Sequence, residues 1–197
     1  MNFLKILPLS KGRLEVLFEI YAAGDDYLRS ISKKLKMNPS LTFNILNKLY
    51  ESQFVVKEKV GKEVQYSLHK NRDYELLVRL LEEYHLETII AKSKYLKAMV
   101  NLLMSNKELI ASSEKIYLFG SYAGGDYTSE SDIDLLFVNE KRKLVGKACR
   151  EISVVIGKSL NPLIYTKKKF EFDLSQQEPL LSSIVYQIKN RIIIQSV

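Results

Sequence analysis

Two short apolar runs on either side of a glycine-rich turn constrain the fold of this chain more than any other feature. Lys115–Phe119 runs directly into Gly120–Ser121, and a second run, Ser131–Val138, begins ten positions after that serine. Short apolar runs bounded by glycine-rich segments are typical of strands rather than helices. The second run carries Asp132 and Asp134 two positions apart, a spacing that on a strand points both carboxylates to one face.

This arrangement predicts a site for a metal-bound triphosphate. Two neighbouring carboxylates repel each other unless a positive charge lies between them. Mg²⁺ takes oxygen ligands and usually keeps water and substrate phosphates in its shell. Gly120 lets the backbone approach a phosphate closely, and Ser121 adds a hydroxyl donor beside the N–H groups at the start of a helix.

The order of strand, Gly-Ser, short glycine-containing helix and Ser-Asp-x-Asp resembles the polymerase-beta-like nucleotidyltransferase superfamily over about residues 115–166. In size the chain resembles the minimal nucleotidyltransferases. The resemblance implies a small α/β domain with a mixed sheet that transfers a nucleoside monophosphate from an NTP and releases pyrophosphate. It implies that Asp132 and Asp134 are catalytic and bind Mg²⁺, and that they bind the nucleotide together with Gly120 and Ser121.

The sequence departs from this family pattern at two places. Members often carry Ala-Arg-Gly where this chain has Ala123–Gly125, so a positive charge near the phosphates is missing. Active members also place a third carboxylate on a later strand, and here Asn161 or Pro162 falls at that position. Neither residue can take a proton at neutral pH. Glu171 and Asp173 lie past the strand and would have to fold back, so the sequence leaves catalytic turnover open.

Three short amphipathic helices are predicted near the amino terminus. Apolar residues at positions 14, 17, 18 and 21 share one helix face, and Gly24 ends that helix. Asp25–Asp26 is predicted to cap a second helix. Asn38–Pro39 is predicted to start a third helix, which runs to about Ser52.

After the third helix the period of the apolar pattern changes to two. Phe54–Lys59 and Glu63–Leu68 are predicted strands around a turn at Gly61. Three helices followed by a hairpin, over residues 11–70, resemble the winged helix-turn-helix of bacterial and archaeal transcription regulators. The resemblance implies that the third helix enters the DNA major groove and that the hairpin, or wing, touches the backbone. The positions implied in DNA binding are Ser40, Asn44, Asn47 and Lys48 on the helix, and Lys57, Lys59 and Lys62 on or beside the wing.

The charge of this segment suits a polyanionic partner such as double-stranded DNA. Residues 1–70 carry 12 Lys or Arg against 7 Asp or Glu, in a chain of net charge +7. Leu41 and Phe43 are expected to face outward, where they can meet thymine methyl groups or pack on a partner chain. The third helix has no arginine for reading guanine, and a winged helix used only for protein contact is the alternative.

The predicted fold class is α+β, with three parts along the chain. Residues 1–70 form the winged helix-turn-helix domain, residues 71–110 a helical linker, and residues 111–197 the nucleotidyltransferase-like domain. In the linker a break is predicted near His85–Glu87, and its apolar stripes are a possible homodimer seam. Beyond Thr166 we expect Lys167–Lys169 in a solvated turn, then a helix near Pro179–Ile188 and a strand at Ile192–Ile194.

Composition predicts a soluble, cytoplasmic protein without a membrane span. The chain has one cysteine, too short an apolar stretch in residues 1–8 for a signal peptide, and no run of about 20 apolar residues. Three functions remain open: a DNA-binding enzyme that transfers a nucleoside monophosphate to an unknown acceptor, a catalytically inactive nucleotide-sensing transcription regulator, and an antitoxin-like partner of a helical toxin.

Overall fold

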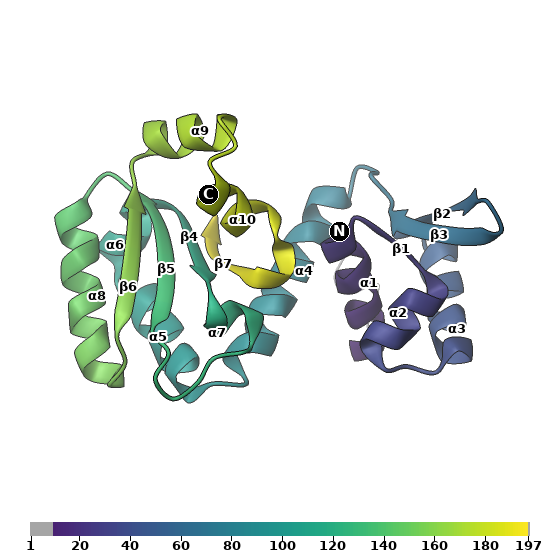
Figure 1. Ribbon diagram of the computed structural model, residues 1–197, viewed down its shortest axis with the longest axis horizontal. Coiled ribbons are helices and arrows are strands. Elements are labelled where there is room, and N and C mark those ends of the chain that lie inside the picture. Colours follow the sequence, from purple (N-terminus) through teal and green to yellow (C-terminus); the bar gives the residue numbers. More distant parts are fainter. Residues whose placement is uncertain (1–9, 197) are drawn as a thin grey trace. The chain divides into compact units, whose positions relative to one another are not determined.

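The computed structural model describes residues 10–196, so the segment considered for a signal peptide lies outside the described residues. The chain divides into two compact units, which meet in the sequence between Tyr84 and His85 (Figure 1). We call them the N-terminal and the C-terminal unit. The fold class is α+β, as predicted. Among the described residues, no helix combines the length and the apolar character needed to cross a membrane.

The N-terminal unit has the element order of a winged helix-turn-helix. It contains three helices and a three-stranded antiparallel sheet of order β1-β3-β2. Strand β1 follows the first helix, and the other two strands follow the third helix. The elements are α1 (Lys11–Ala23), β1 (Asp25–Tyr27), α2 (Leu28–Leu35), α3 (Pro39–Glu51), β2 (Val55–Val60) and β3 (Glu63–Leu68). One buried cluster joins the helices to the inner face of the hairpin, as the periodicity predicted.

Local chemistry explains the end of α1 and the start of α3. Gly24, with φ of +83°, ends α1, and the Asn38 side chain accepts a hydrogen bond from the Ser40 N–H at the start of α3. The predicted cap at Asp25–Asp26 is wrong. Those residues form strand β1, because they pair with β3, and α2 begins only at Leu28.

The linker prediction also needs a correction. Helix α4 (Tyr74–Ile90) runs through His85–Glu87 without a break, and the interruption comes before Ser93, whose side chain caps α5 (Lys94–Ser105). The apolar residues predicted as a dimer seam are largely buried within their own chain. Leu77 and Leu81 belong to the N-terminal core, whereas Ile89, Leu96, Val100 and Leu103 belong to the C-terminal core. Dimerisation stays a prediction, without this stripe as support.

The C-terminal unit is built on a mixed four-stranded sheet of order β6-β5-β4-β7. Only β5 and β6 are parallel, and α8 connects them. The elements after α5 are α6 (Lys107–Ser112), β4 (Ser113–Phe119), α7 (Ser121–Gly124), β5 (Ile133–Asn139), α8 (Arg142–Ile156), β6 (Leu160–Tyr165), α9 (Lys167–Ser175), α10 (Pro179–Tyr186), η2 (Ile188–Asn190) and β7 (Arg191–Ser196). Lys167–Lys169 therefore form the first turn of α9, capped by Thr166, rather than a turn between elements.

Side chains on alternate positions of the central strands enter two cores, one on each face of the sheet. Leu135 and Phe137 pack with residues of α5 and α8, whereas Leu136 and Val138 pack with residues of α9 and α10. Asp134 has the same parity as Leu136, so it lies on the α9–α10 side of the sheet. The strand alternation thus decides on which face of the sheet the Asp134 carboxylate lies.

Candidate functional site

The end of β4 brings Gly120 against the Asp134 carboxylate. Phe119 is the register partner of Asp134 across the β4–β5 ladder, and Gly120 follows with φ of +71°. A Cβ atom at Gly120 would lie 2.6 Å from Asp134 Oδ2. Glycine is therefore required for the backbone conformation and for the close approach alike. Ser121, half-buried, begins α7 directly afterwards.

The two predicted carboxylates lie at the start of β5 and differ in environment. Asp132, in the loop before the strand, is exposed, and Asp134, one residue into it, is half-buried. Burial raises the pKa of Asp134, and the neighbouring Asp132 charge adds to the rise, while a hydrogen bond from Asn161 opposes it. The site disfavours its own negative charge, which a cation would relieve.

The family pattern has a third carboxylate where this chain has Asn161 or Pro162. The parallel register of β5 and β6 shows which of these two residues lies beside the aspartates. Asp134 pairs with Asn161, and Pro162 pairs with Leu135. The Asn161 Nδ2 lies 3.2 Å from Asp132 Oδ2 and 3.4 Å from Asp134 Oδ1, and donates to both. An amide thus bridges the two carboxylates. We refer to Gly120, Ser121, Asp132, Asp134 and Asn161 together as the carboxylate site.

The two later acidic residues lie elsewhere. Asn161 is near the start of β6, whereas Glu171 and Asp173 are on α9, which follows the other end of that strand. Asp173 pairs with Lys169 of the same helix at 3.2 Å, and Glu171 is exposed. The structure therefore does not bring these two carboxylates to the site.

Several residues that the sequence analysis missed hold the loop before Asp132. The rings of Tyr122 and Tyr127 stack with centroids 4.2 Å apart, and the Tyr127 hydroxyl donates to the Lys92 carbonyl. The Lys158 Nζ donates to the carbonyls of Ser129 and Ser131. The hydrogen bonds of Tyr127 and Lys158 join segments about 30 residues apart, and no periodic pattern in the sequence indicates them.

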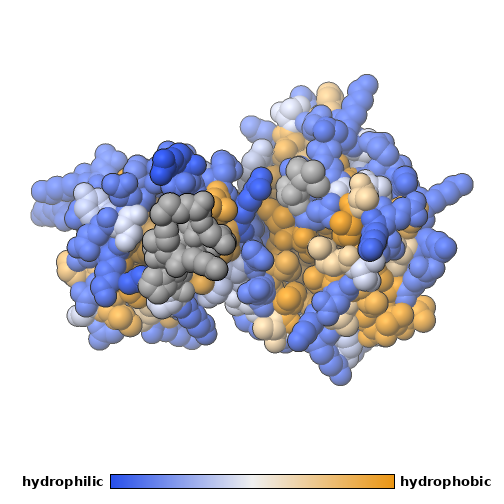
Figure 2. Space-filling model, turned by 180° about the vertical axis from the view of Figure 1, so that it is seen from behind, coloured by the Kyte–Doolittle hydropathy of each residue, from blue (hydrophilic) through white to orange (hydrophobic). Residues whose placement is uncertain are grey.

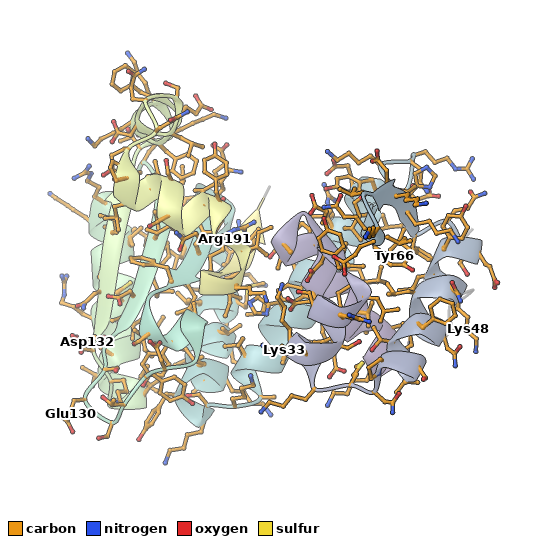
Figure 3. The ribbon with its side chains drawn as sticks, turned by 45° about the vertical axis from the view of Figure 1, so that its right-hand side comes forward. Lys33, Lys48, Tyr66, Glu130, Asp132 and Arg191 are labelled. Carbon is orange, nitrogen blue, oxygen red and sulfur yellow. The ribbon has the colours of Figure 1, made fainter. Side chains whose placement is uncertain are left out.

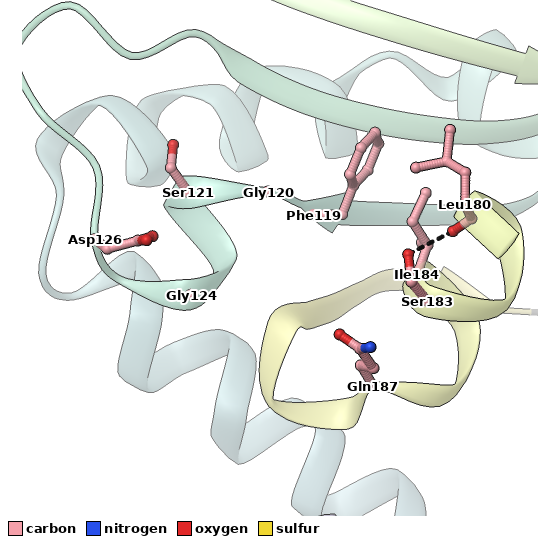
Figure 4. A pocket seen from close by; sticks show the side chains of 9 residues that line it. All are labelled: Phe119, Gly120, Ser121, Gly124, Asp126, Leu180, Ser183, Ile184 and Gln187. Carbon is pink, nitrogen blue, oxygen red and sulfur yellow. Dashed lines mark hydrogen bonds between the residues drawn. The ribbon is translucent and has the colours of Figure 1, made fainter.

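A pocket of about 590 Å³ opens beside the Gly-Ser turn (Figure 4). Its volume lies in the range of small-molecule sites. Phe119, Leu180 and Ile184 give it apolar walls. The other lining residues are Gly120, Ser121, Gly124, Asp126, Ser183 and Gln187. The sequence predicted the Gly-Ser side of this pocket, but treated the α10 side as structural only.

The carboxylate site fits a divalent cation shared with a phosphate. Among residues 10–196, no group of three or more His, Cys, Asp or Glu side chains could hold a metal ion alone. Mg²⁺, however, is usually bound by one or two carboxylates together with substrate phosphates and water. Asp132 and Asp134 supply those two carboxylates, beside a Gly-Ser turn that lines the pocket.

In the N-terminal unit, α3 turns its polar positions outward. Thr42, Ile45, Leu46 and Leu49 are buried. Ser40, Asn44 and Lys48 are exposed and Asn47 is half-buried. Figure 3 shows Lys48 on the outer side of this helix, and Asp132 beside Glu130 in the other unit. Leu41 and Phe43 are exposed as expected, at 52% and 48%.

The wing separates its charges onto two faces. The register places Lys57 and Lys59 opposite Tyr66 and Val64, on the face that begins in the core. Glu58 and Glu63 have the other parity and occupy the opposite face. The Lys57 Nζ lies 4.1 Å from the centroid of the Tyr50 ring, which belongs to α3.

The lysine face of the wing therefore adjoins α3. Lys57, Lys59 and Lys62 are all exposed, and hydrophilic side chains project from the wing end of the unit (Figure 2). We call this surface the α3–wing face. Its residues are Ser40, Asn44, Asn47, Lys48, Lys57, Lys59 and Lys62, the positions predicted for DNA binding.

Comparison with known proteins assigns the C-terminal region to a protein family. The family model of the nucleotidyltransferase domain matches residues 100–194. "Putative protein adenylyltransferase MJ0604" of Methanocaldococcus jannaschii is 38% identical over 80 residues, which cover 40% of this chain and 78% of that protein. "Putative protein adenylyltransferase MJ0141" of the same organism is 39% identical over 61 residues, covering 27% of this chain and 61% of the relative. The chain belongs to the nucleotidyltransferase domain family.

Solved structures give weaker similarities. The transcriptional regulator SlyA is 13% identical, with a TM-score of 0.38, covering 54% of this chain and 79% of SlyA. A toxin–antitoxin structure with AMP-PNP is 17% identical, with a TM-score of 0.35, covering 51% of this chain and 73% of that one. Similarity at this level adds nothing to the family assignment.

Proposed function

We propose that the C-terminal unit binds a complex of Mg²⁺ with a nucleoside triphosphate. The observation that carries the proposal is the close approach of Gly120 to Asp134, which places a Gly-Ser turn that lines the pocket directly beside the carboxylate pair. Asp132 and Asp134 would hold the metal, which supplies charge neutralisation at the phosphates when bound. Gly120 and Ser121 would bind the phosphates.

The pocket beside the Gly-Ser turn would take the nucleoside. Gly120 and Ser121 line this pocket, so the nucleoside of a triphosphate bound at these two residues would extend into the pocket. Phe119, Leu180 and Ile184 supply apolar contacts for a base, and Ser183 and Gln187 supply polar atoms. Which base is selected would then depend on α10 and the segment after it.

Asn161 favours nucleotide binding without turnover. A general base must accept a proton from the attacking hydroxyl, and an amide beside the carboxylate pair cannot. We therefore propose a nucleotide sensor as the first candidate. Transfer of a nucleoside monophosphate to a protein is the second candidate, favoured by the family and by the names of the two relatives.

We further propose that the α3–wing face binds double-stranded DNA. The polar outward positions of α3 and the lysine face of the wing adjoin one another, which suits simultaneous contact with base edges and phosphates. A nucleotide-dependent DNA-binding regulator combines the two proposals in one chain. Binding of a fluorescent duplex, followed by anisotropy at low salt, tests this part, and no affinity for any duplex would contradict it.

Calorimetric titration tests the nucleotide proposal. Each NTP is added with Mg²⁺ to the wild type and to Asp132→Asn/Asp134→Asn, which keeps the shape of the site but removes two negative charges. We expect Mg-dependent affinity to fall at least about tenfold in the variant, since a charge-paired interaction is lost. Glu151→Gln/Glu171→Gln removes the same charge at exposed positions and serves as the control.

A pyrophosphate assay on the same samples separates the candidates. A sensor binds NTP without releasing pyrophosphate, whereas an enzyme releases it and loses the activity in the double Asp variant. If the wild type binds no Mg-NTP, the nucleotide proposal fails for both candidates.

A further inference from the structure

We infer that α3 selects A·T-rich DNA, reading adenine with Asn44 and thymine methyl groups with Leu41 and Phe43. The inference rests on the proposed DNA binding by the α3–wing face. It adds the class of sequence that this face would select.

The orientation of α3 determines which side chains can reach base edges. The buried residues Thr42, Ile45, Leu46 and Leu49 define the inner side of the helix. With about 3.6 residues per turn, Ser40, Asn44 and Asn47 lie opposite them, and Leu41 and Phe43 lie on the two flanks. In helix-turn-helix proteins the N-terminal residues of the recognition helix contact the bases. Ser40–Asn44 occupies that end of α3.

The chemistry of these side chains matches A·T pairs. An asparagine amide can bond both N6 and N7 of adenine, and apolar side chains contact the methyl group of thymine. Leu41 and Phe43 leave about half of their surface exposed in the N-terminal half of the helix, where a polar side chain would otherwise be expected. Contact with thymine methyl groups in the bound state would bury these two side chains, which are exposed in the free protein.

The side chain that most often reads guanine is missing from α3. Guanine O6 and N7 are commonly bound by arginine or lysine. Helix α3 contains no arginine, and its single lysine, Lys48, comes nine residues after Pro39, in the C-terminal half. The other predicted DNA-contacting cations, Lys57, Lys59 and Lys62, are on the wing or its turn. Affinity from the wing lysines would therefore be sequence-neutral, and preference would come from α3.

Selection from a duplex pool tests the inference. Duplexes with eight randomised central base pairs and constant ends are incubated with the full chain, and the bound fraction is sequenced. We expect A·T enrichment with the wild type, and a clearly reduced enrichment with Asn44→Ala, whose exposed position leaves the fold intact and whose thymine-contacting residues remain. Lys59→Ala should bind more weakly but keep the preference. Asn101→Ala, an exposed helical asparagine of the C-terminal unit, is the matched control.

Base analogues in the best selected duplex test the individual contacts. Replacing thymine by uracil removes only the methyl group, and 7-deaza-adenine removes only N7. We expect each replacement to weaken wild-type binding, by up to about tenfold for 7-deaza-adenine. Phe43→Ala should reduce the difference between thymine and uracil, and Leu41→Ala/Phe43→Ala should remove it. Asn44→Ala should remove the difference between adenine and its 7-deaza analogue.

The outcomes distinguish failure of this inference from failure of the proposed DNA binding by the α3–wing face. Binding of the pool without compositional bias, or with enrichment of G·C pairs, overturns the A·T inference and leaves DNA binding standing. An A·T preference that persists undiminished in Asn44→Ala and Phe43→Ala also overturns it, because the wing or the duplex shape would then be responsible. If the wild type binds no duplex at low salt, DNA binding itself fails and the inference fails with it.

Discussion

Each unit holds one carboxylate whose pKa departs from the ordinary aspartate value, and the two departures have opposite signs. Burial acts to raise the pKa of Asp26, but hydrogen bonds from Lys34, Ser30 and the Tyr27 N–H outweigh burial and lower it. Lys34 also lies 3.2 Å from Glu19, another buried carboxylate. In the N-terminal unit Lys34 therefore supplies the positive charge that compensates Asp26 and Glu19.

Among the described residues of the C-terminal unit, none forms an ion pair with Asp134. The pKa of Asp134 is raised, first by burial and then by Asp132, and the partner nearest to both is a neutral amide. The contrast separates an acid that is compensated within the chain from the acid that we propose binds a metal ion. A carboxylate compensated within the chain stabilises the fold, whereas one left uncompensated is poised to take a cation from outside.

Alanine at Gly120 is expected to have the largest effect. The added Cβ would displace the Asp134 carboxylate and force a residue with a side chain into positive φ. We expect Mg-NTP affinity to fall on the order of a hundredfold, equivalent to about 2.7 kcal/mol. Calorimetry measures the loss. Gly125→Ala has a similar φ of +83° but open space around it, so it should cost stability without a comparable loss of affinity.

Removing the internal cation should destabilise the N-terminal unit. Lys34→Met leaves Asp26 and Glu19 buried without their shared partner, and we expect a loss of about 2 kcal/mol, moderated by the partial exposure of Lys34. Because the pKa of Asp26 is lowered, its stabilisation is present above the ordinary value of 3.8 and is lost as the pH falls through the folded-state pKa.

Chemical denaturation followed by circular dichroism, repeated from neutral to acidic pH, measures this loss. The difference between Lys34→Met and the wild type should shrink in acid. Lys143→Met, at an exposed position of α8, is the control. A loss that stays constant with pH would show that the carboxylates are not its source.

The wing should respond to salt in a way that the carboxylate site does not. Lys59 is exposed, where it would neutralise one phosphate of the DNA. Lys59→Ala should therefore weaken DNA binding a few-fold and reduce the slope of log affinity against log salt by about 1. Glu58→Gln, on the opposite face of the wing, should change the slope much less. Anisotropy titrations between about 50 and 200 mM salt measure both slopes.

The smallest expected effect is a gain of stability on removing the Asp134 charge. A raised folded-state pKa means that stability falls as the pH rises from 3.8 through the folded-state value, because the unfolded chain releases this proton first. Asp134→Asn should therefore raise the free energy of unfolding of the C-terminal unit at neutral pH by about 0.5 kcal/mol. The gain should vanish in acid. A loss of stability at neutral pH would contradict the view of Asp134 as an uncompensated charge.

The sequence by itself determined the elements and the residue types of both candidate sites. Apolar periodicity identified the three helices and the hairpin strands of the N-terminal unit, and Asn38–Pro39 and Gly24 marked helix ends, because these signals act over one or two turns of chain. The Gly-Ser turn and the Asp pair were likewise visible, since each lies within a few consecutive residues.

Only the tertiary structure decided which distant residues complete the sites. Asn161 meets the two aspartates from 27 and 29 residues away through the parallel β5–β6 register, and α10 forms one wall of the pocket. Strand β1 exists because β3 pairs with Asp25–Tyr27, where local chemistry favoured a helix cap. Strand pairing couples residues far apart in the chain, and local periodicity carries no information about the register in which two strands meet.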